Sequence, residues 1–152
     1  MNRENIQATI DILQRAQNFC VTSFQGDGYL LVKTEEELHA CGNTACIAGY
    51  VALSSAWRNF GGTVDSIGGS PFIETPTADL YGSDAMAHFW GIDNGTAASI
   101  VYGDFWPDFV LNNDLGRVAP RYWGEMTKEQ AVAMFEHFLK AGEIKPAVSY
   151  GD

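Results

Sequence analysis

The segment TKEQAVAMFEHFLKAG, residues 127–142, restricts the fold more than any other part of the sequence, because it specifies a helix with one apolar side. Thr127 and Gln130 have the spacing of a capping box, in which two side chains satisfy free N–H groups of the first turn. Gly142 follows the last apolar residues and is a typical helix stop. The apolar residues at helical spacing are Ala131, Met134, Phe135, Phe138 and Leu139. Such a helix has to bury one side against other elements, so it predicts a packed helical core.

The N-terminus predicts a second helix of this kind, over residues 2–19, because Ile6, Ile10 and Leu13 recur at i, i+4 and i+7. Between the two ends, the sequence predicts shorter helices that begin at capping residues. These begin at Thr34 (ending by Gly42), at Thr44 (running to Gly61), at Ser83 and at Thr96. Most of the chain is therefore expected to be helical.

A small amount of β-structure is expected as well. Residues 21–34, VTSFQGDGYLLVKT, place two short apolar stretches around a Gly-Asp-Gly turn and predict a β-hairpin. Residues 61–77 are rich in glycine and predict a loop with one small β element. A chain of 152 residues, with 46% apolar and 18% charged residues and no dividing linker, is sufficient for one core. The predicted fold is a single compact domain, residues 1–152, mainly α (α+β), of about five helices with a small β-hairpin.

The sequence has neither a secretory nor a membrane-spanning pattern. Its first ten residues, MNRENIQATI, contain no apolar block followed by a cleavage site, and no apolar run approaches the length of a bilayer span. The three cysteines cannot all pair, and a domain of this size needs no disulfides, which favours a reducing compartment. We therefore expect a cytoplasmic protein without a membrane partner.

The formal net charge is −10, and the acidity is concentrated in the middle of the chain. Residues 59–116 hold eight acidic residues and no Lys or Arg. Residues 1–58 hold six acids and four bases, and residues 117–152 hold five of each, so the two ends contribute −2 and 0. Such a field repels nucleic acid and anionic membranes and attracts basic surfaces. The sequence thus predicts a basic protein partner and no direct contact with nucleic acid, and it does not indicate an oligomeric state.

The acidic middle and the residues after it also contain aromatic clusters, YGDFWPDF (102–109) and RYWGE (121–125). Two interpretations of the acids remain open, a solubilising surface or a docking surface for Lys and Arg. The aromatic residues either fill the core or anchor an interface. The candidate partner-binding residues are Asp79, Asp84, Asp93, Asp104, Trp106, Asp108 and Asp114.

The stretch CGNTACIAGY, residues 41–50, concentrates small residues and two cysteines. One interpretation is a packing joint, in which Cys46 and its small neighbours let another element approach closely. The other is a nucleophile, because Cys46 is the second residue after the Thr44 cap, where free N–H groups and the helix dipole favour a thiolate. A thiol-dependent hydrolase or transferase also needs a base. The candidate bases are His39, His88 and His137.

Metal binding is a third interpretation of the same stretch. His39, Cys41 and Cys46 would supply three ligands, and the fourth would be Cys20 or His88. The spacing H-x-C-x4-C is not one of the common structural zinc patterns, and the acids do not form a calcium-binding loop. We therefore expect neither a metal nor a cofactor.

CGNTACIAGY and the C-terminal T-x-E-Q-A helix resemble a set of small uncharacterised phage and prophage proteins, whose shared pattern is C-G-T-x-x-C-x-A-G-[WY]. The matching residues are Cys41, Gly42, Cys46, Ala48, Gly49 and Tyr50, and Asn43 stands where Thr is usual. The resemblance covers about residues 40–142, interrupted by 61–77. It implies an accessory protein made in an infected or lysogenic bacterial cell, and the motif carries no known chemistry that would transfer a catalytic role.

The leading hypothesis is therefore a non-enzymatic, phage-type acidic module that binds and inhibits a basic host protein, such as a nucleic-acid-handling or defence protein. The alternatives are a thiol-dependent enzyme that uses Cys46 with a histidine base, and a structural or assembly protein.

Overall fold

The computed structural model describes residues 1–21, 46–64 and 71–147. These ranges contain seven α-helices, five of them seven residues or longer, and one three-stranded antiparallel sheet. The predicted mainly helical α+β domain is confirmed. The hairpin predicted for 21–34, apart from its first residue, and the helix predicted from Thr34 lie outside the described residues.

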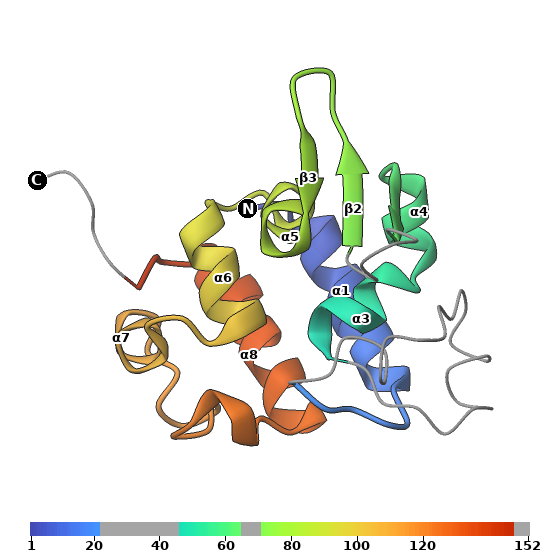
Figure 1. Ribbon diagram of the computed structural model, residues 1–152. Helices are drawn as coiled ribbons and strands as arrows, with labels where there is room; N and C mark the ends of the chain where they lie inside the picture. The colour runs from blue at the N-terminus through green and yellow to red at the C-terminus, as the bar shows by residue number, and fades with distance from the viewer. Residues whose placement is uncertain (22–45, 65–70, 148–152) are drawn as a thin grey trace, which may run out of the picture.

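Figure 1 shows the order of the helices and strands along the described part of the chain. The helices are α1 (Arg3–Arg15), α3 (Ile47–Ala52), α4 (Ser55–Asn59), α5 (Gly82–Trp90), α6 (Asn94–Tyr102), α7 (Trp106–Asn112) and α8 (Lys128–Ala141), with a 3-10 turn η1 (Trp123–Glu125) before α8. The strands are β1 (Gly62–Val64), β2 (Pro71–Glu74) and β3 (Asp79–Tyr81). Figure 1 shows α6, α7 and α8 on one side of the molecule and α3 and α4 on the other.

The core forms where α1 packs against α8. Trp90 at the end of α5 is completely buried there, its ring lies 5.4 Å from that of Phe135, and its indole N–H donates to Thr9 Oγ1 at 2.9 Å. A buried indole N–H needs such a partner, because leaving it unpaired costs about 1–3 kcal/mol. Lys128 Nζ also donates to the carbonyls of Gln14 and Ala16 at the C-terminal end of α1. A cation at this position offsets the negative end of the helix dipole.

The capping box of α8 is present as predicted, with Gln130 N donating to Thr127 Oγ1 and Thr127 N donating to Gln130 Oε1. Gly142 ends the helix with φ +79°. The N-terminal helix is also present, but it ends at Arg15 and not at 19.

The single helix predicted from Thr44 to Gly61 is wrong, because the structure has two helices there, α3 and α4. Ser54 separates them: its hydroxyl donates to the carbonyl of Val51 and accepts from the backbone N–H of Trp57. A serine that bonds to its neighbouring backbone competes with helix continuation. The N-cap of α3 is Cys46 itself.

Two further helix starts differ from the prediction. α5 begins at Gly82, one residue before Ser83, and α6 begins at Asn94, two residues before Thr96. Asp93 caps α6, because its Oδ1 accepts from the backbone N–H of Thr96 at 2.8 Å and its Oδ2 from the Thr96 hydroxyl. A carboxylate at an N-cap also gains from the helix dipole, so the aspartate is the preferred cap.

The glycine-rich residues 61–77 contain more β-structure than predicted. β1 and β2 pair there, and β2 continues the sheet with β3. Gly62 is required in β1, because a Cβ would come within 2.1 Å of the Trp57 ring. That ring in turn donates its indole N–H to the carbonyl of Thr63 at 3.0 Å. The Trp57 side chain therefore connects α4 to β1, and its ring fills the space that a side chain at position 62 would occupy.

Candidate functional site

Cys46 does not have the environment of an activated nucleophile. It is 7% exposed, and burial raises the pKa of its thiol to about 11, although hydrogen bonds from nearby backbone N–H groups act in the opposite direction. Desolvation outweighs the helix N-terminus here, so the raised pKa argues against the thiolate interpretation. This environment agrees with the packing interpretation of the stretch.

The candidate bases do not complete a catalytic group either. His39, like Cys41, lies outside the described residues. His88 is exposed on α5, and its ring lies 5.3 Å from that of Phe60. His137 lies on α8, where it lines a cavity with Asp114 and Lys145. Across the described ranges, no group of three or more His, Cys, Asp and Glu is positioned to hold a metal ion.

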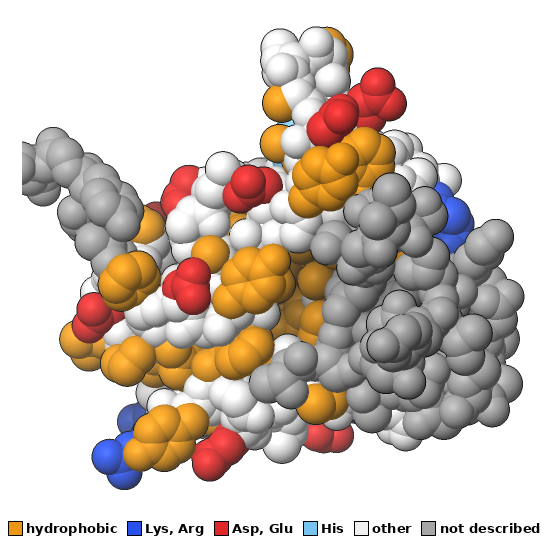
Figure 2. Space-filling view, in the orientation of Figure 1, with side chains coloured by type: hydrophobic (Ala, Val, Ile, Leu, Met, Phe, Trp, Pro, Cys, Tyr) orange, Lys and Arg blue, Asp and Glu red, His pale blue; other side chains and the backbone are white. Residues whose placement is uncertain are grey.

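The candidate acids, in contrast, are all on the surface. The six that were proposed to contact a partner are exposed, and they come from the sheet, the α5 and α6 starts and the α7 region. They are Asp79, Asp84, Asp93, Asp104, Asp108 and Asp114. Figure 2 shows carboxylates lying among hydrophobic side chains on this face of the molecule.

Trp106 is not available to a partner in this structure. It is 3% exposed, its indole N–H donates to the carbonyl of Pro120 at 3.1 Å, and its ring lies 5.7 Å from that of Phe109. The prediction that Trp106 contacts a partner is therefore wrong, and the core-filling interpretation holds for this residue.

Other large apolar side chains remain exposed beside the acids. Tyr102 is 53% exposed, Phe105 60% and Leu111 77%. With the exposed carboxylates Asp104, Asp108 and Asp114, these three side chains make up the α6–α7 surface, a stretch of sequence that runs from the end of α6 to the residue after the C-cap of α7. Aromatic residues such as Tyr are among the residue types that are enriched at protein interfaces.

Phe105 is held in an unusual backbone conformation. Its φ and ψ are 52° and 35°, in the left-handed region, where a residue with a bulky side chain is strained. It serves as the N-cap of α7 without a side-chain hydrogen bond, although its carbonyl accepts from Phe109 N at 3.0 Å. Phe105 therefore combines a strained backbone conformation with an exposed aromatic ring.

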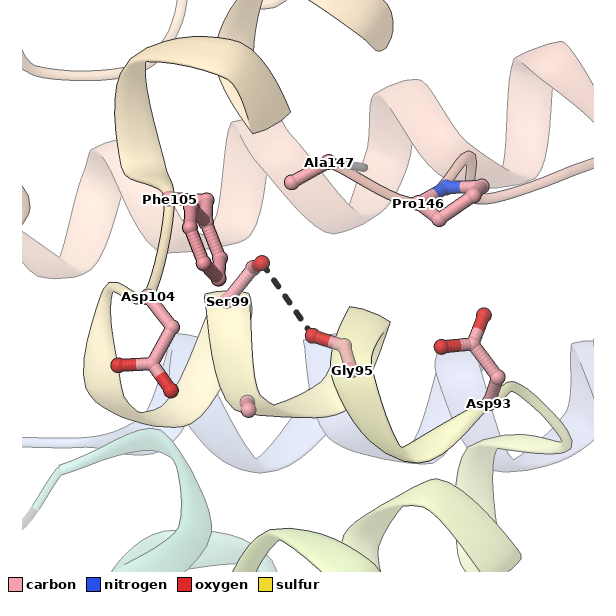
Figure 3. Close-up of a pocket in the computed structure, with 8 residues that line it drawn as sticks. Asp93, Gly95, Ser99, Asp104, Phe105, Pro146 and Ala147 are labelled. Carbon is pink, nitrogen blue, oxygen red and sulfur yellow. Dashed lines mark hydrogen bonds between the residues drawn. The ribbon is translucent and has the colours of Figure 1, made fainter. Parts of the chain in front are cut away.

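A groove lies between α6 and the C-terminal residues Pro146 and Ala147, with a volume of about 240 Å³. We call it the α6 groove. Figure 3 shows Asp93 at one end of α6 and Asp104 at the other, with Phe105 and the C-terminal residues across from the helix. The groove thus has a carboxylate at each end and apolar groups between them.

Two asparagines at the C-terminal end of α7 hold the Pro146–Ala147 wall of this groove. Asn113, which is buried, donates from Nδ2 to the carbonyl of Lys145 at 2.8 Å, and its Oδ1 accepts from Lys145 N at 2.7 Å. Asn112 Nδ2 donates to the carbonyls of Pro146 and Ala147. The four bonds fix a segment that has no helix or strand of its own.

The sequence predicts the acids of this site but not the groove. Asn112 and Asn113 stand more than thirty positions before the segment that they bind, and nothing in the local sequence pairs them with it. The left-handed conformation of Phe105 also has no local signal, because the residues that usually adopt it are Gly, Asn and Asp.

No family model, curated protein or solved structure matches this chain. The resemblance to phage proteins stays a prediction. None of the helices in the described part of the chain combines the length and hydropathy needed to span a bilayer.

Proposed function

We propose that this protein is a binding module that docks on a basic protein partner through its α6–α7 surface. The observation that carries the proposal is the exposure of Tyr102, Phe105 and Leu111 next to Asp104 and Asp108. Carboxylates steer a basic partner and fix its orientation, while aromatic and aliphatic side chains supply the area that is removed from water.

The distribution of charge supports a basic partner. No Lys or Arg occurs between 59 and 116, so no cation of this segment neutralises the surface. Such a surface attracts Lys- and Arg-rich proteins, including those that normally hold nucleic acid, because its carboxylates occupy the place of phosphates. Together with the resemblance to phage proteins, this supports an accessory protein that inhibits a basic host protein in the bacterial cytoplasm.

The test uses two variants with the same change in net charge. In the site variant, Asp104, Asp108 and Asp114 become Asn; in the control, Glu125, Glu129 and Glu136, exposed acids of η1 and α8, become Gln. A bacterial protein captured by the parent chain is purified and titrated against all three proteins at low and high ionic strength. We expect the parent and the control to bind it alike, more weakly as salt increases, and the site variant to bind at least about tenfold more weakly.

Two results would contradict this proposal. One is an affinity that does not change with salt, and the other is a site variant that binds as tightly as the parent. The assembly role is the alternative use of the same exposed side chains, and it predicts self-association. Sedimentation at several concentrations separates the two, because a strict monomer excludes assembly.

A further inference from the structure

We infer that the α6 groove binds a short extended segment of the partner that carries a basic side chain toward each end and an apolar residue between them. This inference rests on the proposed function and names the site at which the partner chain is recognised. The occupant is a peptide segment, because the spacing of Asp93 and Asp104 along α6 and the charge of the groove both fit one.

The length of α6 sets the spacing of the basic residues. Asp93 precedes α6 and Asp104 follows its C-cap, so their α-carbons are on the order of 15 Å apart at a rise of 1.5 Å per residue. An extended chain advances about 3.3 Å per residue, so residues i and i+4 of a bound segment are about 13 Å apart. Residues i and i+4 also point to the same side of a strand, and residue i+2 points with them.

The charge of the groove selects cations at these two ends. Asp93 and Asp104 are both exposed, and neither forms an ion pair with another described residue. Lys145, close to the C-terminal wall, is paired with Glu143 at 3.7 Å. The groove lining itself contains no Lys or Arg.

The middle of the groove suits an apolar residue or the stem of an arginine. Phe105, Ala98, Pro146 and Ala147 present carbon atoms there, and Ser99, which is buried, has already turned its hydroxyl to the carbonyl of Gly95. The face of the Phe105 ring is also a favourable surface for a guanidinium group. The strained backbone at Phe105 therefore has a function in this arrangement: it holds the ring in the groove.

The experiment uses the full chain, labelled with nitrogen-15, and three synthetic peptides with blocked ends. The first is Arg-Ala-Leu-Ala-Arg; the second, Arg-Arg-Ala-Leu-Ala, has the same composition with both charges at one end; the third is Glu-Ala-Leu-Ala-Glu. At low salt we expect the first to shift the backbone amides of residues 93–105 and 144–147 in a saturable manner. We expect the second to bind about threefold to tenfold more weakly and the third to cause no shift.

A matched pair of variants assigns the binding to the groove. Asp93→Asn keeps a side-chain oxygen for the cap of α6 and removes the charge, while Glu136→Gln removes one exposed charge from α8. We expect the first peptide to bind Asp93→Asn about threefold or more weakly than the parent and to bind Glu136→Gln as the parent does.

Three results would each overturn the proposal that the α6 groove binds this peptide segment. They are equal affinity of the first two peptides, unchanged binding of the first peptide to Asp93→Asn, and shifts that spread over all acidic sites. The captured partner distinguishes the outcome for the proposed function, because two of the three acids changed in the site variant, Asp108 and Asp114, lie outside the groove lining. If that partner still depends on these three acids while Asp93→Asn has no effect, the groove fails and the proposed function stands. If the partner also ignores the three acids, both fail.

Discussion

The sulfur of Cys46 accepts a hydrogen bond from the backbone N–H of Gly49 at 3.4 Å, so that a cysteine takes the place of the serine or aspartate that usually caps a helix. The small residues that follow it, Ala48 and Gly49, are both buried. Tyr50 is also buried, and its hydroxyl donates to the carbonyl of Asn18 beyond the end of α1. This part of the motif therefore joins α3 to the N-terminal segment.

The first prediction concerns the reactivity of this thiol. In the folded protein at pH 8, Cys46 is expected to react with iodoacetamide at least about a hundredfold more slowly than in urea, because a pKa of about 11 leaves little thiolate and burial blocks access. Peptide mass spectrometry of timed samples measures the rate. Rapid alkylation of the native thiol would restore the nucleophile interpretation.

The same shift predicts how stability depends on pH. Because the folded pKa is raised from about 9 to about 11, the unfolded thiol ionises first as the pH rises. The contribution of the protonated Cys46 thiol to the free energy of unfolding is therefore complete below pH 9. It is lost between about pH 9 and 11, by up to about 1.4 kcal/mol per pH unit. Urea unfolding of the parent and of Cys46→Ser across this range measures it. The serine does not titrate, so the gap in unfolding free energy between the two proteins has to change with pH.

The third prediction compares two glycines with the same backbone conformation. Gly103 and Gly142 both have φ +79°, but a Cβ on Gly103 would lie 2.5 Å from Trp123 Cγ, whereas a Cβ on Gly142 meets no atom within 4 Å. Gly142→Ala is expected to cost about 1 kcal/mol of backbone strain. Gly103→Ala is expected to cost about 1–3 kcal/mol more, because the Trp123 ring has to move. Equal losses in urea unfolding would show that this contact is unimportant.

The fourth prediction concerns Asn113, one of the two asparagines that hold the wall of the groove. Replacing Asn113 with Ala removes the acceptor of the Lys145 N–H, so that amide is expected to exchange its hydrogen with solvent at least about tenfold faster. Asn112→Ala is the matched control, because Asn112 accepts no bond from that amide and bonds only to the carbonyls of Pro146 and Ala147 among the described residues. Hydrogen exchange followed by NMR reports the rate. Equal protection of the Lys145 amide in Asn113→Ala and in the parent would show that Asn113 does not hold this segment.

Local signals explain which elements the sequence predicts well. The α8 helix is predicted correctly from Thr127 to Gly142, because its cap, its periodicity and its stop lie within one segment. The start of α6 is misplaced because Asp93 and Thr96 are both capping residues, and the choice depends on a hydrogen bond between them. Where two good caps compete, the sequence alone does not decide.

The remaining errors come from contacts between distant parts of the chain. Tryptophan is a residue type that often anchors interfaces, but the Trp106 ring lies in the core, where its indole N–H donates a hydrogen bond to the carbonyl of Pro120. The groove depends on Asn113 reaching Lys145, thirty-two positions later. The acids are predicted to be exposed because charged residues rarely bury without partners, and this general rule holds for all six.

The fifth prediction separates stability from binding at Phe105. Asparagine tolerates the left-handed conformation better than phenylalanine, and the ring is 60% exposed, so Phe105→Asn is expected to raise the free energy of unfolding by up to about 1 kcal/mol. The same change is expected to weaken binding of Arg-Ala-Leu-Ala-Arg, because the groove loses its aromatic wall. Tyr122→Asn, at a 57% exposed position outside both the groove lining and the α6–α7 surface, is the control and is expected not to raise the free energy of unfolding and to leave peptide binding unchanged. If Phe105→Asn stabilises the protein and weakens binding, Phe105 serves binding at the expense of stability. A loss of stability in Phe105→Asn would instead assign the ring to the core, and the strain at its backbone would then have a structural cause.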